Sequence, residues 1–193
     1  MTATIRARSN RSPRSGAGFT LIELVIVITI LGILAAIALP RFVALQRDAR
    51  IAKLNAVRGA VQAASAIVHA AILTRGGVAD AAACPGGGGT ANNTTTVCSE
   101  NGLITVLNGY PEAVDTANIG VTPGIVAAAG LTGVFNPTVA QLTTEGYTVS
   151  GTVTVQTFQI TGAAAPVNCQ FTYTEPIAAG AAPVVSAVII TGC

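Results

Sequence analysis

The sequence has no tryptophan, a single histidine and few charged residues, which make up 9% of its 193 residues. So little charge is unusual for a soluble cytosolic protein. His69 lies in a helical stretch, and neither Ser150 nor Ser186 has a histidine or aspartate near it in the sequence, so no catalytic triad is indicated. Aromatic residues account for 4% and are scattered, which gives no basis for electron conduction. We therefore expect a protein that is not an enzyme.

Motifs for metals and cofactors are also missing. The four cysteines, Cys84, Cys98, Cys169 and Cys193, form no Cys-x-x-Cys pair, so we expect no zinc site. The glycines at 86–89 are not followed by Gly-Lys-Ser/Thr, so they are not a phosphate loop, and no cofactor is expected. An even number of cysteines, all downstream of a long apolar run, instead indicates disulfides formed in an oxidising compartment, with three possible connectivities.

The net charge of +2 hides an uneven distribution of charge. From Gly59 onward the chain has one arginine against six acidic residues, whereas its other basic residues lie before Gly18 or shortly after the apolar run: Arg6, Arg8, Arg11, Arg14, Arg41, Arg47, Arg50, Lys53 and Arg58. This pattern does not predict a nucleic-acid groove. A basic arm followed by an apolar segment is typical of a membrane protein whose arm stays in the cytoplasm.

The apolar run covers residues 19–39 and is broken only by Thr20, Glu23 and Thr29. As a helix it would span roughly 30 Å, enough to cross a bilayer core. Residues 1–18 are polar and basic and are predicted to be a disordered leader. A plain membrane anchor needs only the length of the run. An ordinary secretory signal could be cut at Ala36-Ile37-Ala38, but its apolar stretch would be too long and would contain an acid.

Beyond Pro40 the pattern changes to that of an amphipathic helix. On a helical wheel the helix has three faces. The polar face carries Arg47, Arg50, Arg58, Gln62, Ser65 and His69, and the bulky apolar face carries Val57, Val61, Ala64, Val68 and Ile72. The third, the alanine face, carries Leu45, Ala49, Ala52, Ala56, Ala60, Ala63 and Ile67. We expect the bulky face to pack on the protein's own sheet and the alanine face to admit other helices closely. The alternative is a helix buried on both faces within one domain.

A cation followed by two glycines, Arg75-Gly76-Gly77, predicts the helix end. Residues 19–75 could then form one helix roughly 85 Å long. A partner domain of residues 76–193 is too small to cover it, so lipid or other subunits must bury its first half. In that domain, segments rich in Val, Thr and aromatics predict three or four antiparallel strands, at residues 147–155 with 158–160, 169–174 and 184–191. A short helix is expected at residues 124–130.

Glu23 is the charge that most needs an explanation, because a charge in an apolar span is costly. Thr20-Leu21-Ile22-Glu23 matches a capping box, in which the glutamate bonds the threonine amide. If Phe19 were the mature N-terminus, its free amine on a neighbouring subunit would be the natural countercharge once both are buried. A leader cleaved before the apolar run thus explains the acid, and we prefer it over the other two interpretations.

Gly18-Phe19-Thr20-Leu21-Ile22-Glu23, followed by a long apolar run and Pro40, resembles the cleavage and methylation motif of type IV pilins and pseudopilins. In that family a prepilin peptidase cuts after the residue matching Gly18 and N-methylates the residue matching Phe19. The family's glutamate matches Glu23, while Gly32 and Pro40 match helix positions that bend or loosen during assembly.

Four further segments and a cysteine at the end of the chain look like mannose-sensitive haemagglutinin-type pilins: Leu39-Pro40-Arg41-Phe42, Gln46-Arg47-Asp48-Ala49-Arg50, Gly109-Tyr110-Pro111 and Cys169-Gln170-Phe171-Thr172-Tyr173-Thr174-Glu175. This resemblance implies a Cys169–Cys193 disulfide. Pairing Cys84 with Cys98 is then simplest, with two other connectivities still open. The long leader, the extra cysteine pair and a divergent middle region depart from the pattern. Asn92 and Asn93 each begin an Asn-x-Thr sequon, which a host enzyme could glycosylate.

The resemblance implies an α+β fold, with one long N-terminal helix laid on a small antiparallel sheet in the ladle shape of pilins. It also implies a structural subunit of a type IV pilus used in attachment, made as an inner-membrane precursor and ending on the cell surface in a homo-oligomeric helical filament. Expected partners are prepilin peptidase, a cytoplasmic assembly ATPase, a membrane platform and, before assembly, lipid. The alternatives are a pseudopilin of a secretion or DNA-uptake machine and a membrane-anchored binding domain that never polymerises.

Overall fold

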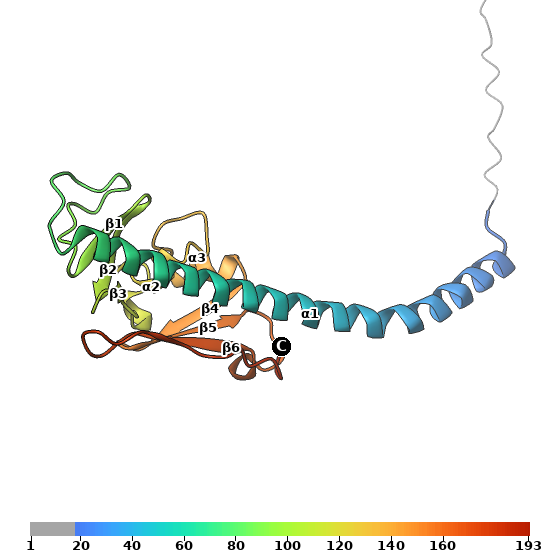
Figure 1. Ribbon diagram of the computed structural model, residues 1–193. Helices are drawn as coiled ribbons and strands as arrows, with labels where there is room; N and C mark the ends of the chain where they lie inside the picture. Colours follow the sequence, from blue (N-terminus) through green and yellow to red (C-terminus); the bar gives the residue numbers. More distant parts are fainter. Residues whose placement is uncertain (1–17) are drawn as a thin grey trace, which may run out of the picture. The chain divides into compact units, whose positions relative to one another are not determined.

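The computed structural model describes residues 18–193 of the chain. The predicted leader, residues 1–18, therefore lies outside the described residues except for Gly18. The chain divides into two compact units, residues 1–43 and residues 44–193, and the long helix α1 has residues in both (Figure 1). Its class is α+β, as predicted from the sequence: a long N-terminal apolar helix followed by a small domain of antiparallel strands.

Helix α1 comprises Leu21–Arg75, so it begins two residues later than predicted. Its start has the predicted capping box: the Thr20 amide donates to Glu23 Oε2 at 2.9 Å, and the Glu23 amide donates to Thr20 Oγ1 at 3.3 Å. The helix continues through Pro40. It ends where predicted, because the Gly76 amide bonds the Ile72 carbonyl at 3.0 Å and Gly76 has the left-handed φ of 60° that glycine adopts easily.

In the first unit, all described residues are exposed to solvent, from Gly18 to Val43. Among the described residues, α1 is the one helix long and apolar enough to cross a membrane by length and composition. The Thr29 hydroxyl donates to the Val25 and Ile26 carbonyls at 3.1 and 2.8 Å, so this polar group is satisfied within the helix. Between residues 24 and 39 the helix thus exposes apolar side chains on every side.

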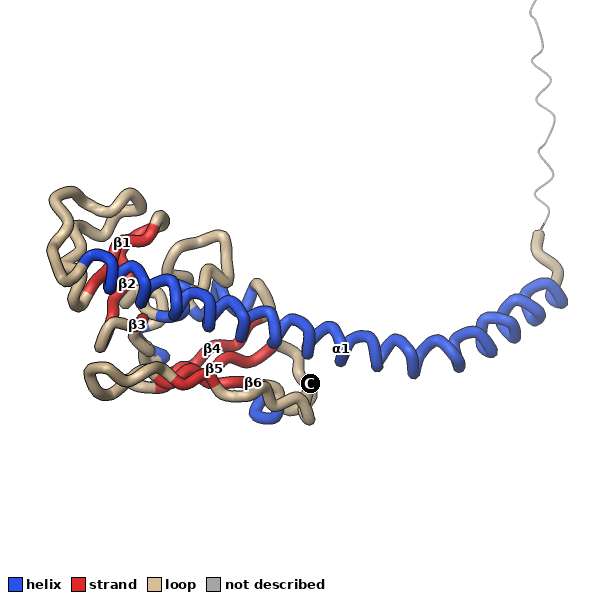
Figure 2. The backbone as a smooth tube through the Cα atoms, viewed as in Figure 1, coloured by secondary structure: helices blue, strands red, loops and turns tan. Residues whose placement is uncertain are grey.

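The second unit, residues 44–193, contains two antiparallel sheets alongside the second half of α1 (Figure 2). The first sheet has the order β1-β2-β3, with bounds Thr96–Ser99, Gly102–Leu107 and Tyr110–Pro111. The second has the order β4-β5-β6-β7, with bounds Tyr147–Gly151, Val155–Ile160, Gln170–Thr174 and Val184–Val185. All neighbours within each sheet follow one another in sequence, so both are simple meanders.

Short helices connect the strands. Helix α2 comprises Ile125–Ala128, within the region where a helix was predicted, and α3 comprises Val139–Thr144. Two 3₁₀ turns cover Thr116–Asn118 and Pro166–Asn168. Helix α3 was not predicted, although it begins with a complete Thr138/Gln141 capping box that is visible in the sequence.

Two strand predictions need correction. The segment 147–155 was predicted as one strand, but β4 ends at Gly151 and the chain turns at Thr152, whose amide bonds the Val155 carbonyl at 2.8 Å. The segment 184–191 pairs as a strand only at Val184–Val185, with one isolated bridge from Gln170 to Ile189. The first sheet was missed altogether.

The second unit, residues 44–193, is called the head below, and its core forms between α1 and the two sheets. Leu54, Val57 and Val61 from α1 pack with the buried faces of β4, β5 and β6, where the rings of Phe158 and Phe171 stack with centroids 4.9 Å apart. Nearer the end of α1, a second cluster joins Val68 to the first sheet through Val97, Ile104 and Val106. The bulky face of α1 therefore packs on the protein's own sheets, as predicted.

Two disulfides close segments of the head. Cys84 is bonded to Cys98, with Cα atoms 5.3 Å apart, and Cys169 is bonded to Cys193, with Cα atoms 4.8 Å apart. The first closes the glycine-rich loop, and the second fixes the end of the chain beside β6. This is the simplest of the three connectivities.

Candidate functional site

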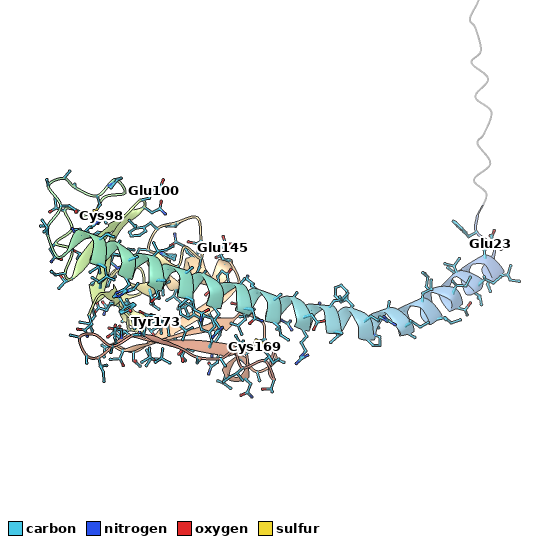
Figure 3. The ribbon with its side chains drawn as sticks, viewed as in Figure 1. Glu23, Cys98, Glu100, Glu145, Cys169 and Tyr173 are labelled. Atoms are coloured by element: carbon cyan, nitrogen blue, oxygen red, sulfur yellow. A yellow bond between two sulfur atoms is a disulfide. The ribbon has the colours of Figure 1, made fainter. Side chains whose placement is uncertain are left out.

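The segment Gly18–Glu23 projects into solvent at the start of α1. Phe19 is 90% exposed, and both Gly18 and Phe19 precede the first helical residue. The bond between Gly18 and Phe19 is therefore in irregular, accessible backbone. Glu23, labelled in Figure 3, is also exposed. Its Oε2 accepts from both the amide and the hydroxyl of Thr20, each at 2.9 Å. The carboxylate is thus satisfied within its own chain while it faces water.

Gly32 and Pro40 lie further along the same helix. At 1.5 Å per residue they are roughly 13 Å and 25 Å from Glu23, so the three residues do not form one compact site. A Cβ added at Gly32 would meet no other atom within 4 Å. The residues matching the family motif are therefore spread along one exposed apolar rod, a surface suited to packing between molecules.

The second half of α1 presents its alanine face to solvent. Five of its six central members, Ala49, Ala52, Ala56, Ala63 and Ile67, are exposed, and Ala60 is half-buried. On the opposite side, Leu54, Val57, Val61, Ala64 and Val68 are buried. The sequence predicted this division into two faces, and no part of the described chain occupies the alanine face.

The polar face of α1 contacts the end of the chain. Arg50 Nη1 donates to the Cys193 carbonyl at 3.0 Å, and Arg58 Nε donates to the Ser186 carbonyl at 2.7 Å. Lys53 donates to the Glu145 carbonyl and lies 4.2 Å from the centre of the Tyr147 ring. This role of the polar face was not predicted, because carbonyls far away in sequence leave no pattern near α1.

His69 contacts the first sheet. Its ring stacks on Tyr110, with centroids 4.0 Å apart and planes at 4°, and Nδ1 lies 2.9 Å from the Gly109 carbonyl. Ser65, on the same face, is buried. The sequence placed His69 on the polar face of the helix, but the turn that contacts its ring lies 40 residues away and leaves no pattern near it.

Both sequon asparagines have structural contacts. Asn93 is 1% exposed; its Nδ2 donates to the Val78 carbonyl at 2.6 Å and to Asp80 at 2.8 Å, and its Oδ1 accepts from Arg75 at 3.1 Å. Arg75 also pairs with Asp80 at 3.3 Å. Asn92 is exposed, but its Oδ1 accepts from three successive amides, those of Thr94 to Thr96. A glycan at Asn93 would require this buried cluster to open.

Two side chains of the second sheet and that of Glu175, just after β6, hold residues 111–114 at the end of β3. Glu175 Oε2 accepts from the Ala113 amide at 2.6 Å, Gln156 Oε1 accepts from the Val114 amide at 3.1 Å, and Tyr173 Oη donates to the Pro111 carbonyl at 2.7 Å. Burial raises the pKa of the Glu175 carboxyl; the Ala113 amide lowers it, and the nearby Glu112 charge raises it further. Burial likewise raises the pKa of the Tyr173 hydroxyl. These groups connect the two sheets.

Within residues 18–193, no group of three or more histidine, cysteine or acidic side chains is placed to hold a metal ion. The features that distinguish the described chain are thus an N-terminal motif, an exposed apolar helix and a disulfide-closed head.

Comparisons with known proteins bear on the N-terminal third. Residues 13–39 match the family described as the prokaryotic N-terminal methylation motif. The chain is also 60% identical over 50 residues to the type IV narrow pilus major component PilA5 of Thermus thermophilus; these residues are 26% of this chain and 43% of that protein. The chain thus matches less than half of the relative's length. No solved structure matches the chain.

These matches establish a type IV prepilin methylation motif in this chain. The narrower resemblance to mannose-sensitive haemagglutinin-type pilins stays a prediction.

Proposed function

We propose that the chain is the precursor of a structural subunit of a type IV pilus. The observation that carries the proposal is the methylation motif at residues 13–39, placed at the start of an apolar helix exposed on every side. Such a surface is stable only in lipid or against other protein helices. A membrane-inserted precursor that later packs into a filament needs both environments in turn.

Processing is expected at the start of this helix. A prepilin peptidase would cut after Gly18 and methylate the new N-terminus at Phe19. The exposed, irregular backbone at these two residues supports access by an enzyme. Cleavage leaves a positively charged amine four residues before Glu23.

Glu23 is expected to pair with the Phe19 amine of a neighbouring subunit. In the single chain its carboxylate is satisfied by Thr20 and water, but burial in a filament removes the water. An uncompensated buried charge is strongly destabilising, so the register that brings an amine to Glu23 is favoured. Gly32 and Pro40 would let the helix adapt as it packs.

Assembly would need an external source of energy. Transfer of an apolar helix from lipid to a protein interior changes the free energy little, because both surroundings are apolar. We infer that a cytoplasmic ATPase and an inner-membrane platform extrude the subunits. The filament would lie outside the cell, where the two disulfides of the head are stable.

A pseudopilin of a secretion or DNA-uptake machine is the second candidate, because it would share the motif and the helix. Abundance distinguishes the two, since a major pilin forms long surface fibres and a pseudopilin stays within the envelope. The disulfide that closes residues 169–193 favours the pilin. An enzymatic function would be supported only if a hydrolase activity remained after deletion of residues 1–40.

The intact mass and N-terminal sequence of protein sheared from cells test the proposal. We expect a chain that begins at methylated Phe19 and has four oxidised cysteines. A chain beginning at Met1 and confined to membranes would support an anchored domain instead. A start at Leu39 would indicate an ordinary secretory signal and would refute the proposal.

The substitution Glu23→Ala tests the role of the carboxylate in assembly. We expect loss of sheared filaments, with the precursor still in the membrane, because the buried amine would lack its countercharge. Thr29→Val is the matched control, since the Thr29 hydroxyl bonds only carbonyls of its own helix. Normal filaments from the Glu23→Ala variant would contradict the pairing.

A further inference from the structure

Opposite charges are segregated within the head. Residues 76–193 contain no lysine or arginine and have six acidic residues: Asp80, Glu100, Glu112, Asp115, Glu145 and Glu175. The basic residues of the second unit all lie on α1, which in this unit carries a single acidic residue, Asp48: Arg47, Arg50, Lys53, Arg58 and Arg75. A molecule divided in this way presents a basic and an acidic surface to its surroundings.

Apart from Arg75, the cations of α1 pair with no carboxylate among the described residues. Among residues 18–193, the one ion pair joins Arg75 to Asp80 at 3.3 Å. Arg50, Lys53 and Arg58 donate to main-chain carbonyls, and Arg47, which is exposed, reaches the Ile190 carbonyl at only 3.4 Å. Arg47 therefore has unused donors that face solvent.

Among the described residues, three of these six acidic side chains are bonded within the head; of the other three, Glu112 is half-buried, whereas Glu100 and Glu145 are exposed. Asp80 pairs with Arg75, Asp115 accepts from the amides of Ala117 and Asn118, and Glu175 is buried. Glu145 lies beside Lys53, which bonds its carbonyl. Glu100 lies in the turn between β1 and β2; its side chain is exposed and makes no hydrogen bond to any described residue.

Arg47 and Glu100 lie at opposite ends of the head. The β1–β2 hairpin packs beside Val68 of α1, which is 21 residues, or roughly 32 Å, beyond Arg47. Figure 3 labels Glu100 at the β1 end, and Figure 1 marks the C-terminus, near the carbonyl that Arg47 contacts, at the other end. The two charges cannot meet in one molecule, but they can meet between two.

We propose that the head of one copy docks on the next through its Glu100 end, with Glu100 paired to Arg47 of the second copy. Contacts between opposite ends are heterologous, and when they do not close into a ring they generate an open helical filament. The charge division thus orients each added subunit. This inference rests on the proposed filament function and names the surfaces that meet.

A charge exchange in the full-length chain tests the pairing in cells. Arg47→Glu and Glu100→Arg each place like charges opposite one another. We expect each to lower the amount of sheared filament about fivefold, the factor that corresponds to about 1 kcal/mol, the upper value for an exposed ion pair. The double variant R47E/E100R restores opposite charges and should return the yield toward that of the wild type.

Gln62→Glu is the matched control, because it changes the charge at an exposed position of α1 that lies 15 residues, or roughly 22 Å, beyond Arg47. It should leave the filament yield unchanged. Urea unfolding of the detergent-extracted variants, followed by tyrosine circular dichroism, should show the same midpoint as the wild type, which separates assembly from folding.

Normal yield from both single variants would overturn the inference and leave the filament function intact. Loss in both without recovery in the double variant would also overturn it, since the two residues would then contact something else, such as lipid phosphates. If the wild-type chain is absent from sheared filaments, the proposed function fails and the inference fails with it.

Discussion

Glu175 allows a sharp test of how the two sheets of the head are joined. It is 4% exposed, and its Oε2 accepts from the Ala113 amide at 2.6 Å. Together with Gln156 and Tyr173 it holds the backbone after β3 against the second sheet. Each of these contacts satisfies a main-chain group that the fold removes from water, so the loss of one partner leaves a buried polar group unpaired.

We expect Glu175→Ala to lower the free energy of unfolding by about 1–3 kcal/mol, the usual effect of leaving a buried amide without its acceptor. Glu175→Gln retains an acceptor oxygen at nearly the same place and removes the charge. At acidic pH we therefore expect it to lie within about 1 kcal/mol of the wild type. Glu145→Gln, an exposed carboxylate in the same head, is the control and should change little.

The pH dependence follows from the raised pKa of Glu175. Burial makes the folded chain hold this proton more tightly than the unfolded chain, whose carboxyl has a pKa near its ordinary value of 4.5. The folded state binds more protons in the window between these two pKa values, so the contribution of Glu175 to stability is present below 4.5 and is lost as pH rises through the raised pKa. Glu175→Gln lacks this loss, and its stability relative to the wild type should increase with pH.

Urea unfolding of the oxidised, detergent-extracted chain between about pH 4 and about pH 8 would measure this difference. Because the chain has no tryptophan, near-ultraviolet circular dichroism of its three tyrosines is the suitable signal. The reasoning is refuted if Glu175→Ala unfolds at the wild-type urea concentration. The electrostatic part would be refuted if the stability of Glu175→Gln relative to the wild type stays constant or falls as pH rises.

Two further predictions concern the loop and the disulfides. Asn93→Ala should lower the free energy of unfolding by about 2–4 kcal/mol, because it leaves buried partners unpaired and places alanine at the positive φ of 55°. Asn92→Ala, at an exposed site, should lower it less. Urea unfolding compares the two variants, and equal losses of stability would contradict the role of the buried cluster. Replacing Cys169 and Cys193 by serine should lower the free energy of unfolding by about 3.5 kcal/mol, by the chain-entropy relation for a separation of 24 residues. The measurement is the melting temperature, which should fall; an unchanged value would count against this prediction.

The long helix was well predicted because its signals are local. Side chains three and four residues apart share a face, so the wheel alone separated Val57, Val61 and Val68 from the alanine face. The cap at Thr20 and the stop at Gly76 also involve only near neighbours. Where structure depends on contacts between residues about four positions apart or fewer, it can be predicted from a single sequence.

The first sheet was missed although it left signals. Residues 103–107 are an apolar run interrupted only by Thr105, and Asn108-Gly109 forms the tight turn to β3 with φ values of 51° and 86°. A short apolar run followed by an Asn-Gly turn is a strong hairpin pattern, so this part of the first sheet was predictable from the sequence.

The polar face of α1 could not have been interpreted in the same way. Its partners are carbonyls of Ser186, Ile190 and Cys193, between 128 and 143 residues away, and a carbonyl has the same chemistry at every position. Only the tertiary fold decides which carbonyls meet Arg50 and Arg58. The polar pattern predicted that this face avoids the apolar core, but not that it anchors the end of the chain.

In the proposed filament, specificity must come from few groups. Packing of apolar helices is nearly neutral relative to lipid and tolerates sliding, because neighbouring registers along an apolar rod differ little. A charge removed from water tolerates no such shift, since an unpaired buried carboxylate is far more costly than a lost apolar contact. Glu23 and the divided charges of the head are therefore the features of this chain best able to select one register and one direction of growth.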